Sequence, residues 1–263
     1  MSFQLLRPSS GRVPILISVP HCGTEFPEEL KGLYDSSLIS SPDDTDWFVD
    51  QLYDFAPEMG ITMITAKYSR WVIDLNRDPQ SRPLYNDGRI ITQLCPTHSF
   101  AGDEIYLDGY HPGKEDIDFR LQAYYWPYYQ KIEEELHEIK AEFGQVVFWD
   151  AHSIRQMVPL IRQEKFPDLI LGDNNGATAS SLLAKTAIDQ LKRRGHKVNY
   201  NDPFKGGYLT RYFGKPESHQ HALQLEMTKI NYMDDDEVNY HPQRAARVRD
   251  TLATVFEKLL EAL

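Results

Sequence analysis

The stretch VVFWDAHS (residues 146–153) runs from an apolar segment directly into an acid and a histidine. A short, continuous apolar run of this kind is typical of a strand that is buried on both faces. Such a strand usually ends in the Gly, Asn or Pro of a turn, but this one ends in Asp150 and His152, which are titratable. We therefore expect the strand to deliver polar side chains to a functional site.

Strand-like and helix-like segments alternate on both sides of this stretch. Further apolar or alternating runs predict strands at 13–21, 61–77 (one strand or two), 197–203 and 221–229. Helical patterns occupy 45–60, 116–144 (with a possible break at Pro127), 177–196 and 242–263. This alternation predicts an α/β fold with a mostly parallel sheet covered on both faces. No repeat or flexible linker divides the chain, so we expect one domain over 1–263.

The bulk composition restricts the possible partners. The 263 residues carry a net charge of −11, and 41% of them are hydrophobic, which is enough for a large core. Nucleic acids and anionic membranes require a positive surface, so neither is expected as a partner. The two cysteines form no framework, and the apolar run near the N-terminus is far shorter than the ~20 residues of a membrane span. We expect a soluble, cytoplasmic protein.

Histidines follow two of the predicted strands, at His21 and His152. Ligands of open α/β sheets lie beyond the carboxyl ends of the strands, so these two imidazoles are expected to converge there. Two histidines and one carboxylate are a donor set for zinc that leaves a position open for water. The candidate carboxylates are Glu25, Asp43, Asp44, Asp46 and Asp150.

The stretch SRWVIDLNRDP (69–79) holds a second polar cluster. Arg70, Asn76 and Arg77 offer a planar guanidinium fork and a neutral amide donor, both suited to a substrate carboxylate. The alternative is an exposed turn in which Arg77 only pairs with Asp74 or Asp78.

Alternation in HALQLEM (221–227) indicates a third functional side chain. Leu223 and Leu225 point to one face of the strand, which sends Glu226 to the other. A carboxylate in an apolar strand has a raised pKa, which suits a general base for an activated water. The alternative is an edge strand with Glu226 in solvent.

Two further segments look like loops beside a site. The segment 80–116 is rich in Pro, Gly, Tyr and Asp, and long loops in compact enzymes often line a site. GGYLTRYFG (206–214) supplies Arg211, either in a flexible loop over the substrate or in an ordinary turn.

Six ordered blocks together resemble the N-formylglutamate amidohydrolase family. They are SVPHCGTEFP, DDTDWFVDQLY, SRWVIDLNRDP, DAHSI, GGYLTRYFG and HALQLEM, and the match runs from about residue 14 to 233. The resemblance implies a three-layer α/β/α fold with a mixed sheet, of the phosphorylase/hydrolase-like type and related to zinc carboxypeptidases and aspartoacylase. It also implies a zinc hydrolase that cleaves N-formyl-L-glutamate to formate and glutamate in histidine degradation.

The resemblance also assigns residues to the metal. His21 and His152 are similar to the two imidazole ligands of one Zn²⁺ or another divalent ion. The His-x-x-Glu of the carboxypeptidases is missing, because Thr24 occupies its last position. The resemblance therefore favours Asp46 as the carboxylate ligand, ahead of Glu25 and Asp44.

For the substrate, Asn76 and Arg77 resemble the pair that binds a carboxylate in the carboxypeptidase and aspartoacylase relatives, and Arg70 resembles their upstream arginine. Glu226 falls at the position of their catalytic glutamate. Arg70 and Arg211 are the candidates for stabilising the oxyanion. The alternatives are a zinc amidohydrolase of another small acidic N-acyl amino acid, or a non-enzymatic acidic α/β binding protein.

Overall fold

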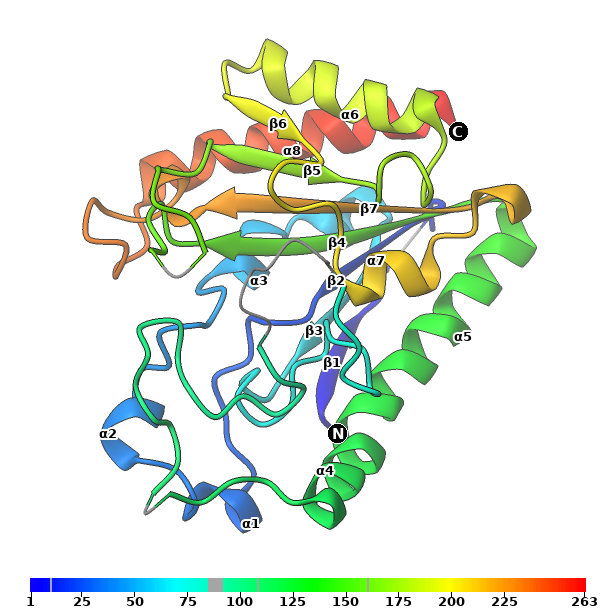
Figure 1. The fold of residues 1–263 in the computed structure, drawn as a ribbon. Coiled ribbons are helices and arrows are strands. Elements are labelled where there is room, and N and C mark those ends of the chain that lie inside the picture. The colour runs from blue at the N-terminus through cyan, green and yellow to red at the C-terminus, as the bar shows by residue number, and fades with distance from the viewer. Residues whose placement is uncertain (10, 85–91, 108, 160) are drawn as a thin grey trace.

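The structure is a computed structural model that describes residues 1–9, 11–84, 92–107, 109–159 and 161–263. Its described residues form a seven-stranded sheet in the order β1-β3-β2-β4-β7-β5-β6 (Figure 1). The strands are β1 (Phe3–Leu6), β2 (Ile15–Val19), β3 (Thr62–Ala66), β4 (Val146–Ile154), β5 (Leu169–Gly172), β6 (Val198–Tyr200) and β7 (Gln220–Thr228). Two pairings are antiparallel, β1 with β3 and β5 with β7, and the other four are parallel. The predicted mixed, mostly parallel sheet is therefore confirmed.

Helices connect the strands. The α-helices are α1 (Glu28–Lys31), α2 (Ser36–Ile39), α3 (Val49–Leu52), α4 (Lys114–Arg120), α5 (Trp126–Phe143), α6 (Ser181–Arg193), α7 (Tyr208–Phe213) and α8 (Pro242–Ala262). A π-helical segment, η2 (Leu121–Tyr125), joins α4 to α5, and short 3₁₀ turns are η1 (Ala56–Met59), η3 (Pro216–Ser218) and η4 (Lys229–Asn231). No helix among the described residues is long and apolar enough to cross a membrane.

Alternate residues of the strands pack against helices on opposite faces of the sheet. In β4, Val147, Trp149 and Ala151 pack in one core with residues of α3, α6 and α8, whereas Val146 and Phe148 pack in another with residues of α5. The helices that contribute to the two cores cover the two sides of the sheet, with α6 and α8 on one side and α5 on the other (Figure 1). Because side chains alternate across a strand, a continuous apolar run supplies both cores at once. The three-layer arrangement is thus confirmed.

The segment 45–60 does not form the single helix that its pattern predicts. It forms α3 and the 3₁₀ turn η1 instead, and ends at Gly60 with a φ of 83°. Phe48 precedes α3 with a φ of 63°, which is left-handed and outside a right-handed helix. Pro57 has no N–H with which to continue α-helical hydrogen bonding.

The second half of the segment 61–77 is buried but forms no strand. Side chains from the helical layer bind its backbone instead: Arg120 Nη1 donates to Val72 O over 2.9 Å, and Tyr129 Oη donates to Leu75 O over 2.7 Å. Buried backbone carbonyls need partners, and side chains can supply them in place of a neighbouring strand. Of the one or two strands expected in this segment, the structure therefore forms one, β3.

The helical stretch predicted at 116–144 is present and runs past Pro127. Proline removes one N–H from the helical ladder, and the π-helical segment η2 lies immediately before it. Gly144 ends the helix with a φ of 77°, a left-handed conformation that glycine adopts without steric cost.

A buried carboxylate ties the N-terminal segment to α5. The side chain of Glu135 is fully buried and forms ion pairs with Arg7 and Arg12, whose side chains are 53% and 19% exposed. Removing both arginines takes these two ion-pair partners from the buried carboxylate of Glu135. A buried charge that loses its partners is strongly destabilising.

We expect the double variant Arg7→Ala/Arg12→Ala to lose about 3 kcal/mol of unfolding free energy. Urea denaturation followed by circular dichroism measures the change. Adding Glu135→Gln removes the unpaired charge and should recover part of the loss. A double variant within about 1 kcal/mol of wild type would contradict this account.

Candidate metal centre and active site

Two neighbouring strands place four polar side chains on one face of the sheet. In the parallel pairing of β4 with β7, Asp150 lies opposite Gln224 and His152 lies opposite Glu226. These positions alternate with residues of the α8-side core, so they share the face that α5 covers nearer the start of the strands. The four side chains lie toward the carboxyl ends of the strands, where ligands of α/β sheets bind.

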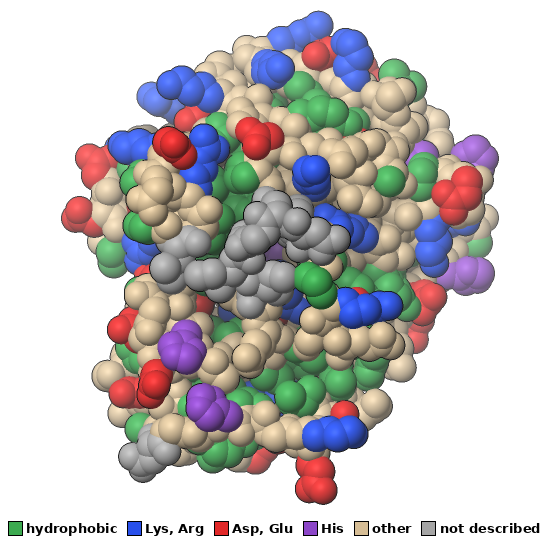
Figure 2. All heavy atoms as spheres, viewed as in Figure 1, with side chains coloured by type: hydrophobic (Ala, Val, Ile, Leu, Met, Phe, Trp, Pro, Cys, Tyr) green, Lys and Arg blue, Asp and Glu red, His purple; other side chains and the backbone are tan. Residues whose placement is uncertain are grey.

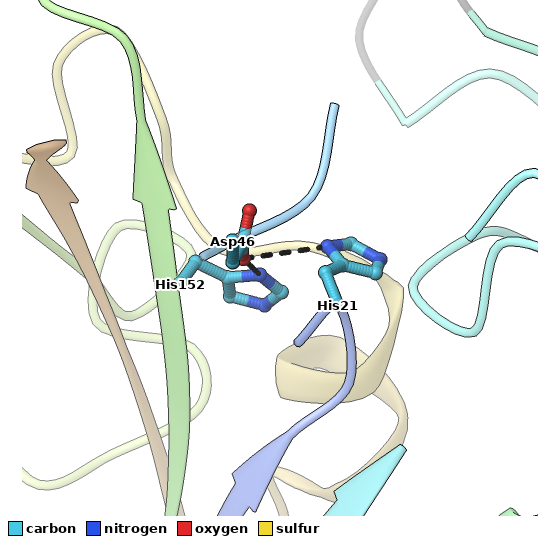
Figure 3. Close-up of side chains that lie close together, drawn as sticks. All are labelled: His21, Asp46 and His152. Carbon is cyan, nitrogen blue, oxygen red and sulfur yellow. Dashed lines mark hydrogen bonds and ion pairs between the residues drawn. The ribbon is translucent and has the colours of Figure 1, made fainter. Parts of the chain in front are cut away.

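His21 and Asp46 reach the same place from other segments. His21 follows β2, and its carbonyl accepts a hydrogen bond from the backbone N–H of Asp46 (3.0 Å). Asp46 Oδ2 lies 3.2 Å from His152 Nδ1 and 3.7 Å from His21 Nδ1 (Figure 3). One ligand atom of each residue lies within 4.8 Å of the others, and all three residues are buried.

The other ring nitrogen of each imidazole, Nε2, contacts a second carboxylate. His21 Nε2 lies 2.8 Å from Asp74 Oδ1, and His152 Nε2 lies 3.0 Å from Asp150 Oδ1. A carboxylate on one ring nitrogen holds its proton and leaves the other nitrogen free for a metal. The donor set of two Nδ1 atoms and the carboxylate of Asp46 therefore fits a divalent metal ion.

The acids of this cluster are held in their charged forms. Burial opposes the charge of Asp46, but hydrogen bonds from His152 and His21 outweigh it and lower the pKa of Asp46. Burial likewise opposes the charge of Asp74, but Arg70 and other nearby cationic groups lower the pKa of Asp74 well below its usual value. A ligand carboxylate must be ionised to bind a metal, and so must a carboxylate that accepts the imidazole proton.

The structure brings neither alternative carboxylate to the two histidines. Glu25 has a side chain that is 61% exposed and lies 3.3 Å from Lys67. Asp44 is buried, but it accepts hydrogen bonds from Trp71 Nε1 (2.7 Å) and from the backbone N–H of Phe100 (2.8 Å). Asp44 thus links two loops beside the site.

Glu226 lies on an interior strand, so the edge-strand alternative is wrong. Burial raises the pKa of Glu226 to about 8, and nearby Asp46 and Asp150 add to the rise while His152 and Arg70 oppose it. A carboxyl group with a pKa near neutrality is suited to take up and return a proton.

A cavity of about 470 Å³ opens from these residues and is lined by Arg70, Asn76 and Arg77. Arg70 Nη2 donates to Asp74 Oδ2 over 2.5 Å, and Arg77 donates to Thr92 Oγ1 from Nε (2.9 Å) and Nη2 (2.6 Å). Arg70 is buried, and the Arg77 side chain is only 23% exposed. The cluster is therefore not exposed, although Arg77 does pair with Asp74 (3.7 Å), as the alternative interpretation expected.

The amide of Asn76 has a fixed orientation. Its Oδ1 accepts the backbone N–H of Leu209 at the start of α7 (2.8 Å), so Nδ2 faces His152 Nε2 (3.0 Å). Gly207 packs so closely that a Cβ there would lie 2.2 Å from Asn76 Nδ2. Gln224 Oε1 in turn accepts the backbone N–H of Gly207 over 2.6 Å.

Arg211 lies in a helix and not in the loop or turn that was expected from the sequence. The segment 206–214 contains helix α7 rather than a loop, and Arg211 donates to the backbone carbonyls of Gly206 (3.0 Å) and Leu84 (2.8 Å). The structure does not place it among the described residues that line the cavity, whereas Arg82 does line it.

Part of the described segment 80–116 lines the cavity, namely Arg82, Leu84, Thr92, Gln93, Pro96, Thr97, His98, Ser99, Phe100 and Gly102. This agrees with the expectation that the segment borders a site. The expectation for residues 85–91 and 108 lies outside the described residues.

Residues 13–233 match the family model described as N-formylglutamate amidohydrolase. The chain belongs to this family. The resemblance drawn from the six sequence blocks is thus confirmed. Two relatives named N-formylglutamate deformylase support the assignment: one from Pseudomonas aeruginosa is 40% identical and covers 95% of this chain and 94% of its own, and one from Pseudomonas putida is 37% identical with 96% and 93% covered.

Solved structures agree with this membership of the N-formylglutamate amidohydrolase family. The crystal structure of N-formylglutamate amidohydrolase from Ralstonia eutropha superposes with a TM-score of 0.80 at 26% identity, covering 98% of this chain and 97% of that one. A gene product of Agrobacterium tumefaciens superposes at 0.78 with 17% identity, covering 99% and 95%, and shows the shared fold.

Two residues of the site in this member of the N-formylglutamate amidohydrolase family, Asp74 and Arg82, were not predicted from the sequence as site residues. Asp74 was considered only as a partner of Arg77, yet it contacts His21. Alternation along the strand does place Gln224 on the face of Glu226, and its Nε2 lies 3.4 Å from Glu226 Oε2. Arg82 lies in the long loop and carries no signal of its own.

The outer carboxylates give a test of the metal centre. Asp150→Asn replaces an acceptor of the His152 Nε2–H with an amide, and we expect metal affinity to fall ~10–100-fold. Competition with a chelator of known affinity measures the change. Asp189→Asn, on an exposed side of α6, is the matched control. Equal affinity in both variants would exclude this role for Asp150.

Proposed function

We propose that this protein hydrolyses N-formyl-L-glutamate to formate and L-glutamate. The observation that carries the proposal is the buried group of His21, Asp46 and His152 with Glu226 beside it, at the end of an arginine-lined cavity. The names of the two Pseudomonas relatives support the choice of substrate.

One divalent metal ion per chain, which we propose to be zinc, would be held by His21, Asp46 and His152. When bound, it supplies a Lewis acid that polarises the formyl carbonyl and lowers the pKa of a water. Imidazole and carboxylate donors suit zinc, and the outer carboxylates Asp74 and Asp150 orient the two rings.

Glu226 acts as general base and then as general acid. It takes a proton from the water that attacks the formyl carbon, and it returns a proton to the glutamate nitrogen as the C–N bond breaks. Gln224 Nε2 lies 3.4 Å from Glu226 Oε2 and limits how the carboxylate can turn. Arg70, buried and anchored on Asp74, is placed to stabilise the negative charge that develops on the formyl oxygen.

The other cavity residues bind the substrate carboxylates. N-formylglutamate carries two of them, and we assign one to Asn76 and Arg77 and the other to Arg82. The orientation of the Asn76 amide is fixed, because its Oδ1 accepts the N–H of Leu209 and its Nδ2 lies 3.0 Å from His152 Nε2. We propose that Arg211 acts indirectly, by holding the loops at Gly206 and Leu84.

Local charge reconciles an anionic substrate with an acidic protein. The chain has a net charge of −11, yet several Lys and Arg side chains lie near the middle of the molecular face that Figure 2 shows. Cationic groups concentrated in a cleft attract an anion at short range regardless of the distant net charge. We place the protein in the cytoplasm, where its two free cysteines stay reduced.

The test measures formate release from N-formyl-L-glutamate by protein of known metal content. We expect turnover that a chelator abolishes and that added zinc restores. Acetate release from N-acetyl-L-aspartate, measured in parallel, separates a deacylase of another N-acyl amino acid. Folded protein with neither bound metal nor turnover would instead indicate the non-enzymatic binding protein.

A further inference from the structure

A second cavity of about 250 Å³ lies directly beside the first. The two cavities share three lining residues, namely Phe100, Ser153 and Ile154. Ser153 and Ile154 directly follow His152 in β4, so the shared wall stands next to the metal centre. Of the three, Phe100 has the largest side chain and comes from outside the sheet.

Phe100 is held at both its backbone and its ring. Its N–H donates to Asp44 Oδ1 over 2.8 Å, and the other oxygen of this buried carboxylate accepts from Trp71 Nε1 over 2.7 Å. The ring centroid lies 5.0 Å from Arg70 Cζ, within the range of a cation–π contact. The wall is therefore fixed by groups that belong to the active site or adjoin it in sequence.

The second cavity has room for several additional carbon atoms. Its 250 Å³ compares with about 30 Å³ for one water in the liquid. Met157, Val158 and Pro159 give part of its lining an apolar character. The proposed substrate has only a formyl group on the acyl side, which needs none of this space.

We propose that Phe100 sets the upper size of the acyl group that this enzyme removes, and that Asp44 positions Phe100 for this purpose. The inference rests on the proposed deformylase function. An acyl group that extends from Arg70 toward the second cavity meets the Phe100 ring, which packs over Arg70 and whose backbone Asp44 holds in place. Without the ring, the two cavities join next to Ser153 and Ile154, and the added volume admits longer N-acyl glutamates.

The experiment measures kcat/KM for N-formyl-, N-acetyl-, N-propionyl- and N-butyryl-L-glutamate with wild type and Phe100→Ala. We expect wild type to prefer the formyl substrate. In the variant, the ratio of kcat/KM for the butyryl substrate to kcat/KM for the formyl substrate should rise at least about tenfold, since one methylene in a hydrophobic pocket changes kcat/KM by about that factor. The ratio is the readout because any general loss of activity through Arg70 cancels in it.

Two further variants control the result. Met157→Ala enlarges the second cavity away from the shared wall and should leave the ratio unchanged. Asp44→Asn should shift the ratio in the same direction as Phe100→Ala but less, since it weakens one of the two bonds that the carboxylate accepts.

An unchanged ratio in Phe100→Ala, or wild type that cleaves the butyryl and formyl substrates equally well, would overturn the proposal. Should Phe100→Ala lose all activity, Phe100→Leu keeps an apolar side chain against Arg70 and the same criterion applies to it. Wild type without any formate release would instead reject the deformylase function itself, so the two failures are distinguishable.

Discussion

Replacing His152 with Ala should strip the protein of stoichiometric metal and abolish formate release. His152 contributes Nδ1 to a group of three buried donor residues, and two donors bind a divalent ion far more weakly than three. Loss of an outer carboxylate already costs ~10–100-fold in metal affinity, and loss of a direct ligand should exceed that. Metal analysis of the purified variant and the formate assay measure the two effects separately.

The matched control is His137→Ala, which removes an exposed histidine from α5. It should keep both metal and activity. Circular dichroism establishes that His152→Ala is folded. If folded His152→Ala retained one metal per chain and normal turnover, the metal centre would have to lie elsewhere.

Glu226→Gln should lower kcat by ~10²–10⁴-fold, the range that general acid–base catalysis contributes. The amide keeps the size of the side chain but can neither take a proton from water nor return one to nitrogen. We expect KM and metal content to stay close to wild type, because Glu226 is not among the three grouped donors. Steady-state kinetics with metal analysis of the same preparation gives all three quantities.

Glu217→Gln, at an exposed position in the 3₁₀ turn η3, controls for the loss of one carboxylate. A Glu226→Gln variant whose kcat falls less than tenfold would argue that another group moves the proton. A variant that loses its metal would show that Glu226 supports the metal centre instead.

Local sequence patterns were sufficient where a side chain is positioned by its own strand. The apolar run before His152 predicted a buried strand, and alternation around Leu223 and Leu225 sent Glu226 to the side opposite them. Both inferences use the two-residue period of an extended chain, which depends only on neighbouring residues. The same pattern also predicted correctly that the sheet is covered on both faces.

Patterns were insufficient where the backbone depends on distant residues. The stretch around Val72 reads as a strand because it is apolar, but its carbonyl is bound by Arg120, 48 residues away. Helix α7 was unexpected for a similar reason, since Asn76 accepts the N–H of Leu209 in its first turn across 133 residues. Neither contact leaves a trace in the local sequence.

The candidate metal centre combines residues that local patterns predict with residues that only distant contacts position. The two histidines were found from strand ends, but the choice of Asp46 came from resemblance and not from spacing. Asp46 is held by the hydrogen bond from its N–H to the carbonyl of His21, 25 residues away, which no periodicity predicts. Asp74 was missed because its contact with His21 spans 53 residues.

The way the helical layer holds the backbone at Val72 and Leu75 has a consequence for how this family can diversify. Arg120 is fully buried and Tyr129 nearly so, and they hold the segment that carries Arg70, Asn76 and Arg77. Inherited changes at these helix positions would shift Arg70 and Arg77 without altering a residue that lines the cavity. Libraries for new substrate preferences should therefore include the buried face of α4 and α5, and comparisons limited to pocket residues will underestimate how far relatives differ.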